Sequence, residues 1–161
     1  MPAYFETGMY VGATPWHGLG TYVGEEGLRT KDALDRGDLL WTVSKRPLFS
    51  TEAAVPSDKI EGTPFGSLSL KDYRAIVRDT DNSAYGIVKK DYTLFQNEEM
   101  GAFADDLVDD GSLRIHTAGS LNGGRRVWLL GKVGSTEIIP KDKVDHYLFL
   151  YTGHDRSEEH T

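Results

Sequence analysis

Apolar and polar positions alternate along several short stretches of this 161-residue chain. The alternation predicts strands at residues 40–46, 73–78, 84–88, 113–118, 125–133 and 147–151. Turn-forming residues at 80–83 and at Asn122-Gly123-Gly124 join four of these strands into two hairpins. The last strand is apolar on both faces, which is typical of a strand inside a sheet.

One stretch has a helical period instead. Five apolar residues recur at spacings of three and four and predict a helix at 97–110: Met100, Phe103, Ala104, Leu107 and Val108. We expect Asn97 to cap the start of this helix and Gly111 to end it. The apolar stripe needs a partner, so we expect it to pack on one face of a single sheet that contains both hairpins. The predicted fold class is therefore α+β, with a mainly antiparallel sheet of two hairpins plus flanking strands and one principal helix.

The distribution of glycine divides the chain. Residues 1–28 hold six glycines and show no period, so we expect an irregular, glycine-rich N-terminal segment, with Trp16-His17-Gly18 in a structural role. Residues 29–155 are expected to form a single α+β domain, and 156–161 a polar tail.

Composition excludes several kinds of site. The chain has no cysteine, which excludes disulfides, thiolate metal sites and cysteine nucleophiles. The histidines show no metal-ligand spacing, and no nucleophile elbow is present. We therefore predict no catalytic residue, no metal and no cofactor, and an enzyme is the least favoured class. The chain has no apolar run long enough to span a membrane, and its start does not resemble a signal peptide, so we expect no membrane contact and a cytoplasmic location.

The net charge of −7 is unevenly placed. Residues 97–110 carry six acids and no base, whereas residues 112–133 carry four bases and no acid. A basic face can bind a polyanion even on an acidic protein, because salt screens charges beyond about 8–10 Å.

The second hairpin carries most of these bases. With a two-residue turn at Asn122-Gly123, one strand face collects Leu113, Ile115, Thr117, Arg126, Trp128 and Leu130, and is expected to be mostly core. The other face collects Arg114, His116, Ala118, Ser120, Arg125, Val127 and Leu129, and is expected to meet a phosphate or carboxylate. Moving the turn by one position keeps both sets, whereas a three-residue turn changes them.

Several short strings form a joint motif set between residues 6 and 155. They are Gly8-Met9-Tyr10, Pro15-Trp16-His17-Gly18-Leu19-Gly20, Trp41-Thr42-Val43, Arg46-Pro47-Leu48, residues 73–78, Tyr92, Gln96-Asn97-Glu98, Ala118-Gly119-Ser120-Leu121 and Gly123-Gly124-Arg125-Arg126-Val127-Trp128. With this set the chain resembles the N-terminal half of the phage/plasmid-like protein family, domain-of-unknown-function family 932. The resemblance implies a setting in phages and plasmids, and no mechanism. The predicted order of three strands followed by a helix is also similar to the core of phage single-strand annealing recombinases.

Our first hypothesis is a phage or mobile-element protein that binds single-stranded DNA, as an accessory in recombination or annealing. The basic residues would contact phosphates and Trp128 would stack on bases. The expected nucleic-acid-binding residues are Arg114, His116, Ser120, Arg125, Lys89, Lys90 and Trp128. The alternative is an interaction module that uses a sheet edge or face to bind another protein or a second copy, as a homo-oligomer. Salt dependence separates the two, because only contacts with phosphates release counterions.

Overall fold

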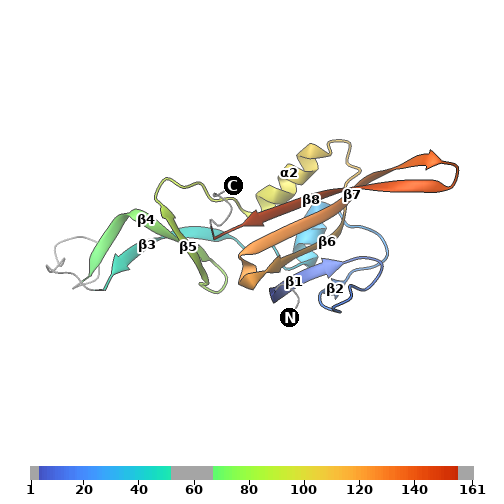
Figure 1. Cartoon of the computed structure of the whole chain (residues 1–161). Coiled ribbons are helices and arrows are strands. Elements are labelled where there is room, and N and C mark those ends of the chain that lie inside the picture. Colours follow the sequence, from blue (N-terminus) through green and yellow to red (C-terminus); the bar gives the residue numbers. More distant parts are fainter. Residues whose placement is uncertain (1–3, 52–66, 156–161) are drawn as a thin grey trace. The chain divides into compact units, whose positions relative to one another are not determined.

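A computed structural model describes residues 4–51 and 67–155 of the chain (Figure 1). The predicted polar tail, 156–161, lies outside the described residues. The elements are β1 Phe5–Tyr10, β2 Thr21–Tyr22, α1 Thr30–Arg36, β3 Val43–Ser50, β4 Leu68–Arg78, β5 Ala84–Lys89, α2 Asn97–Leu107, β6 Arg114–Leu121, the 3-10 turn η2 Asn122–Gly124, β7 Arg126–Ile139 and β8 Asp142–Gly153. The fold class is α+β with mainly antiparallel pairing, as predicted, and β1 pairs with β2 in parallel.

The strands form two sheets in two compact units. The five-strand unit, Met1–Trp41 with Phe95–Gly153, holds a sheet of order β2-β1-β6-β7-β8 and both helices. The three-strand unit, Thr42–Leu94 with His154–Thr161, holds a sheet of order β3-β4-β5. The prediction that both hairpins share one sheet is therefore wrong. The three strands and the helix whose order is similar to annealing recombinases also fall in different units.

The reason lies in the N-terminal segment, which is not irregular throughout. Its strand β1 pairs with β6, so that β6 has β1 and β7 as its neighbours and no strand of the first hairpin. The register of β1 shifts between Phe5 and Thr7, so that its side chains do not alternate regularly. A six-residue strand with a bulge and a glycine gives little periodic signal.

The core of the five-strand unit lies between one face of its sheet, here called the inner face, and the helices. Met9, Ala118 and Leu129 are paired in register across β1, β6 and β7, and each is at most 1% exposed. Helix α1 contacts β6, α2 contacts β8, and the two helices contact each other. In Figure 1, α1 is seen behind the sheet. The inner face is therefore the covered one.

Helix α2 buries a different stripe from the predicted one. Its buried residues are Asn97, Met100, Gly101 and Ala104, which still follow helical spacing. Phe103 is 49% exposed, so the expectation that it belongs to the core is wrong. Gly101 sets this rotation, because a Cβ there would lie only 2.8 Å from Thr30 Cγ2 on α1. The close approach turns the small residue, and not the aromatic ring, towards α1.

The start of α2 also differs from the prediction. Gln96 is the N-cap, and the Glu99 side chain accepts a hydrogen bond from the Gln96 backbone N–H at 2.7 Å in a capping box. Asn97 is instead buried, and its Nδ2 donates to the Leu39 carbonyl oxygen at 2.9 Å. Asn97 thus fixes the segment after α1 to the first turn of α2.

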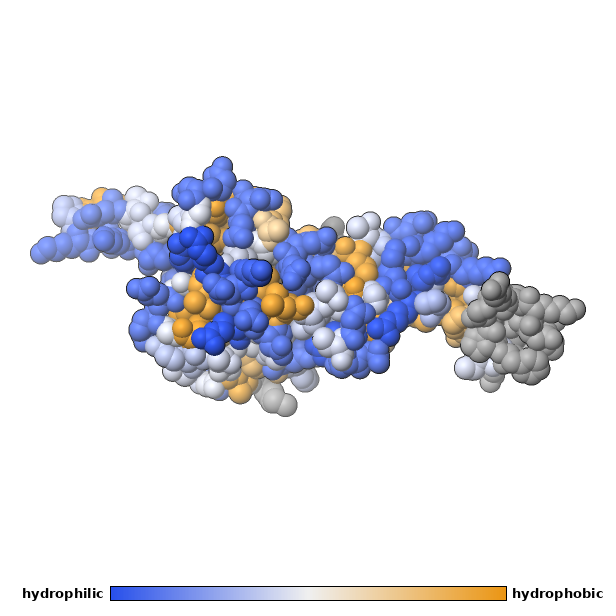
Figure 2. Space-filling model, turned by 180° about the vertical axis from the view of Figure 1, so that it is seen from behind, coloured by the Kyte–Doolittle hydropathy of each residue, from blue (hydrophilic) through white to orange (hydrophobic). Residues whose placement is uncertain are grey.

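Strands β7 and β8 continue well beyond the predicted strands. They pair from Arg126 opposite Gly153 to Ile139 opposite Asp142, with register shifts between Lys132 and Gly134 and between Glu137 and Ile139. Residues 134–146 project from the sheet as a two-stranded arm (Figure 1). Both strands of the arm are exposed on both faces. Figure 2 shows mainly hydrophilic residues along it. A ribbon exposed on both sides has no apolar alternation, which is why the pattern stops near Val133.

Candidate functional site

The outer face of the five-stranded sheet, opposite the helices, carries a row of aromatic side chains. Residues paired across strands share a face, so the register gives its rows directly. One row runs Gly8, Gly119, Trp128 and Tyr151 on β1, β6, β7 and β8. The next row runs Tyr10, Thr117, Leu130 and Phe149 on the same strands. The outer face therefore carries aromatic rings from β1, β7 and β8, with Gly119 and Thr117 of β6 between them.

Two glycines form the floor under this surface. A Cβ on Gly119 would lie 2.3 Å from Trp128 Cη2, so the indole lies against the bare backbone of β6. A Cβ on Gly8 would lie 3.0 Å from Phe5 Cε2, and the Phe5 and Trp128 rings are 6.3 Å apart. Trp128 Nε1 donates to Thr117 Oγ1 at 3.4 Å. The rings can lie flat only because these positions lack side chains.

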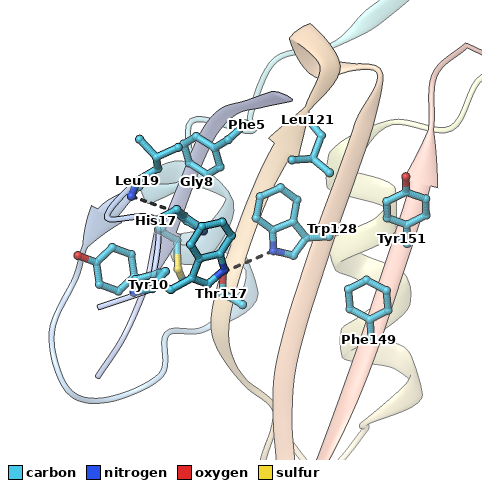
Figure 3. A pocket seen from close by; sticks show the side chains of 14 residues that line it. Phe5, Gly8, Tyr10, His17, Leu19, Thr117, Leu121, Trp128, Phe149 and Tyr151 are labelled. Carbon is cyan, nitrogen blue, oxygen red and sulfur yellow. Dashed lines mark hydrogen bonds between the residues drawn. The ribbon is translucent and has the colours of Figure 1, made fainter. Parts of the chain in front are cut away.

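The loop after β1 closes one side of the surface and makes a pocket of about 400 Å³ (Figure 3). The volume of this pocket is at the low end of the range typical of small-molecule sites. The lining residues are Phe5, Gly8, Met9, Tyr10, Pro15, Trp16, His17, Leu19, Gly20, Thr117, Leu121, Trp128, Phe149 and Tyr151. Trp16 is 87% exposed, so this ring is not a core anchor.

His17 brings one polar group to the pocket. Its Nδ1 accepts a hydrogen bond from the Leu19 backbone N–H at 3.0 Å, which in the neutral ring places the proton on Nε2. The ring lies 5.8 Å from Phe5 and 5.4 Å from Trp16, between centroids. Nε2 is therefore a hydrogen-bond donor among aromatic rings.

Basic residues flank the aromatic rows on both sides. On one side, Leu121 pairs with Arg126 and Arg126 with Gly153. On the other side, Arg114 pairs with Lys132 and Lys132 with Tyr147. The aromatic rows thus lie between one row that contains Arg126 and one that contains Arg114 and Lys132.

His116 and the acid Asp145 lie beside the row with Arg114 and Lys132. Lys132 Nζ lies 2.9 Å from Asp145 Oδ1, and the His116 ring packs edge-on to Tyr147 at 5.5 Å. Burial, with a smaller contribution from the Lys132 charge, lowers the pKa of His116. Hydrogen bonds from Ser135 and then Lys132 lower the pKa of Asp145. At neutral pH the imidazole is therefore uncharged, and the cations of this row are Arg114 and Lys132.

The structure brings together only part of the predicted site. Arg114, His116 and Trp128 share the outer face, although Trp128 was expected in the core. Ser120 lies on the inner face, fully buried, within 3.0 Å of Thr7 Oγ1 and 2.9 Å of Glu6 Oε2. Arg125 lies in the loop and donates to the Asn122 carbonyl oxygen at 3.2 Å. The expectation that Ser120 lies beside the basic residues is wrong.

A bulge at His116 explains this rearrangement. Thr117 to Leu121 pair with Leu130 to Arg126, and in this region the same residues share a face as in the predicted hairpin. The register then shifts between Ile115 and Thr117, which moves Ile115 to the inner face and Arg114 to the outer face. The faces also exchange roles, because Val127 and Leu129 are the buried ones. Neither the bulge nor the choice of covered face is visible in the alternation.

Lys89 and Lys90 belong to the three-strand unit. Lys90 Nζ lies 3.5 Å from Asp72 Oδ1, and its carbonyl oxygen accepts a hydrogen bond from Lys45 Nζ at 2.7 Å. Lys89 ends β5 and is exposed. These lysines are therefore part of a different sheet from the aromatic rows.

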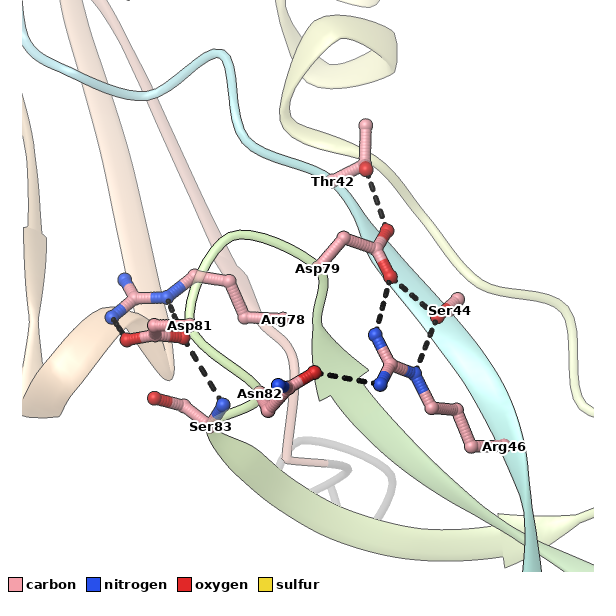
Figure 4. A network of polar contacts seen from close by, with 8 residues as sticks. All are labelled: Thr42, Ser44, Arg46, Arg78, Asp79, Asp81, Asn82 and Ser83. Carbon is pink, nitrogen blue, oxygen red and sulfur yellow. Dashed lines mark hydrogen bonds and ion pairs between the residues drawn. The ribbon is translucent and has the colours of Figure 1, made fainter.

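A second polar cluster in the three-strand unit holds its strands together (Figure 4). Asp79 accepts hydrogen bonds from Thr42 and Ser44 at 2.6 Å each and from Arg46 at 3.1 Å. The hydrogen bond from Ser44, then those from Thr42 and Arg46, lower the pKa of Asp79. These three donors lie in β3 or directly before it, so the cluster joins the β4–β5 turn to β3.

Asp81 plays a similar part within that turn. Its carboxylate accepts two hydrogen bonds from Arg78, at 3.0 and 2.6 Å, and one from the Ser83 backbone N–H at 3.1 Å. The Arg78 guanidinium holds the pKa of Asp81 well below its usual range, and Ser83 adds to this. These satisfied carboxylates stabilise the turn.

The described residues include no group of three or more histidine or acidic side chains placed to hold a metal ion. They also include no helix of the length and apolarity needed to cross a membrane. What the outer face offers chemically is aromatic stacking area, a few donors and flanking cations.

Comparison with known protein families gives a match in the second half of the chain. The sequence profile described as "Domain of unknown function (DUF932)" matches residues 84–159. No curated protein and no solved structure shows significant similarity to the chain. The match confirms the predicted family, although it begins at residue 84 and does not support the expected likeness to the N-terminal half of the family over 6–155. Residues 84–159, slightly less than half of the chain, are thus similar to the DUF932 family.

Proposed function

We propose that the outer face of the five-stranded sheet binds single-stranded DNA. The observation that carries the proposal is the pair of aromatic rows between two basic rows on an open sheet face. Unpaired bases stack on exposed aromatic rings, and such stacking is worth about 1–3 kcal/mol per base. Phosphates meet arginine and lysine alongside.

The aromatic rings best placed to stack are those on β7 and β8. Phe149 is 59% exposed and Tyr151 44% exposed, and their rings lie 6.2 Å apart at an interplanar angle of 21°. Trp128 lies directly across from Tyr151. Exposed rings such as those of Phe149 and Tyr151 can stack on the faces of unpaired bases, whereas the bases of a duplex are already stacked on one another.

The flanking cations supply the contacts with phosphate. Arg114 and Lys132 lie at one border of the aromatic rows and Arg126 at the other. Each phosphate contact releases counterions, so the affinity falls as salt rises. A few cations predict a shallow slope of log affinity against log salt, of about one unit per contact.

A matched pair of phenylalanine variants tests the proposal. Phe149→Ala removes a ring from the outer face, whereas Phe103→Ala removes a ring of similar exposure from α2. Binding of a labelled single-stranded oligonucleotide is measured by fluorescence anisotropy, with a duplex of the same sequence as competitor. We expect F149A to weaken binding about 5- to 150-fold, the equivalent of one lost stacking contact, and F103A to leave it unchanged.

Three outcomes contradict the proposal. If F149A and F103A change the binding affinity equally, the outer face does not bind the oligonucleotide. Preference for the duplex removes the stacking argument. Absence of any salt-dependent binding by the unaltered protein favours the alternative, an apolar surface that binds a protein segment.

The biological setting of this proposal is recombination or annealing in a phage or mobile element, in the cytoplasm of the bacterial host. The resemblance to the phage/plasmid-like family supports this setting. An annealing accessory accelerates pairing of complementary strands, so the rate of duplex formation with and without protein tests it. F149A serves there as the impaired variant.

A further inference from the structure

Strand β8 forms a free edge of the five-stranded sheet. Among the described residues, 4–51 and 67–155, β7 is the one strand that pairs with it. β8 is 12 residues long and contains no proline, and its single glycine is the last residue. The register shifts of this hairpin all lie on β7, so the backbone of β8 is regular. A long and regular edge presents unpaired N–H and C=O groups that can pair with another strand.

The arm makes this edge accessible on both sides. Residues 142–147 are exposed, and so are the apolar side chains at its end: Ile138 is 68% exposed, Ile139 61% and Val144 40%. A two-stranded ribbon that packs on nothing is only marginally stable in water. A third strand along β8 would add both hydrogen bonds and apolar cover.

The charges along the arm are self-complementary. The sequence from 141 to 146 reads Lys141, Asp142, Lys143, Val144, Asp145, His146. If two copies of β8 pair antiparallel about a two-fold axis at Val144, Lys143 of each copy lies opposite Asp145 of the other. The same axis places Asp142 opposite His146, and the two Val144 side chains opposite each other. Opposite charges in such positions are stabilising.

The neighbouring registers lack this match. Moving the axis to Lys143 places the two lysines opposite each other, and moving it to Asp145 does the same for the two acids. Directly opposed like charges are destabilising in a sheet. Lysines on an edge strand often prevent pairing, but here each has an acidic partner when the second strand is the same sequence.

The Asp145 carboxylate has capacity for this contact. Ser135 Oγ at 2.5 Å and Lys132 Nζ at 2.9 Å both contact its Oδ1. Its Oδ2 remains as an acceptor for Lys143 of a second copy. Lys143 itself is exposed.

We propose that the partner of this edge is a second copy of the chain, joined through antiparallel pairing of β8 with β8 about Val144. Side chains paired across strands share a face, so the outer faces of the two copies become one continuous face. The contact is isologous and closes as a dimer. This inference is independent of nucleic-acid binding.

Single cysteines test the register, because the chain has none of its own. Val144→Cys places two thiols opposite each other only at the proposed axis, within the range that a disulfide can bridge. Thr136→Cys is the matched control, since Thr136 pairs with Val144 on the same arm but lies on β7, with β8 between it and the second copy. Under mild oxidation we expect V144C to form a covalent dimer and T136C to remain monomeric on a non-reducing gel.

Sedimentation velocity of the uncrosslinked protein provides a second measurement. We expect the unaltered chain to dimerise and Lys143→Glu to raise the dissociation constant at least about tenfold, because the symmetry turns two attractive pairs into two repulsive ones. Lys71→Glu, the same charge change in the three-strand unit, should have no effect. A monomeric native protein, equal crosslinking of V144C and T136C, or equal effects of K143E and K71E would each overturn the proposal.

Discussion

The stability of the five-strand unit depends on Met100 more than on the larger Phe103, which is the reverse of what the helical pattern predicts. Met100 is 2% exposed on the face of α2 that packs in the core, whereas Phe103 is 49% exposed. Met100→Ala removes a fully buried side chain, and such changes cost about 2–5 kcal/mol. Phe103→Ala removes a ring that water already contacts on one side, so we expect roughly 1–2 kcal/mol, below the 3–5 kcal/mol of a buried phenylalanine.

Urea unfolding followed by tryptophan fluorescence isolates the relevant unit. All three tryptophans, Trp16, Trp41 and Trp128, belong to the five-strand unit, so the signal reports its unfolding and not that of the three-strand unit. The free energy of unfolding comes from linear extrapolation, and an unchanged slope shows that stability alone changed.

The comparison of the two variants shows which face of α2 is buried. If F103A destabilises as much as M100A, the rotation of α2 set by Gly101 is wrong, and the stripe predicted from the sequence is the buried one. The same two proteins serve as controls for the binding assays, because their substitutions lie away from the outer face.

Three further predictions concern other contacts. Gly101→Val should destabilise the five-strand unit by about 1–3 kcal/mol in the same fluorescence assay, because its side chain overlaps Thr30; an unchanged midpoint would contradict the close helix approach. Asn97→Ala should cost about 1–3 kcal/mol, since it leaves the buried Leu39 carbonyl oxygen without its hydrogen bond, and a neutral result would mean that water replaces the amide. Folding lowers the pKa values of Asp79 and Asp81. Their ionised carboxylates should therefore stabilise the three-strand unit fully at pH values above the ordinary carboxyl pKa, and this stabilisation should be lost as the pH falls through their pKa values in the folded protein. Asp79→Asn should flatten that acid dependence in hydrogen exchange of β3 and β4 amides, and an unaltered profile would refute the assignment.

Local patterns in the sequence were sufficient for elements that are half-buried and regular. The first hairpin, α2, the second hairpin and β8 all follow from alternation or helical spacing together with turn residues, and so does the α+β class. The sequence also predicts that Thr117, Trp128 and Leu130 share a face of the second hairpin. This is local information, because a turn fixes the pairing of the strands on either side of it.

Only the tertiary structure decided which faces are covered and which strands meet. Alternation separates two faces but does not say which one a helix will cover, so Trp128 and Ser120 exchanged their expected positions. The bulge at His116 places one extra residue in β6 relative to β7, and no pattern in the sequence marks it. This bulge brings Arg114 onto the face of Trp128. The aromatic surface needs β1 beside β6, more than a hundred residues apart in the chain, and an approach close enough that glycine is required at positions 8 and 119. Such contacts depend on how segments that are distant in the sequence pack together, and local sequence patterns do not determine that packing.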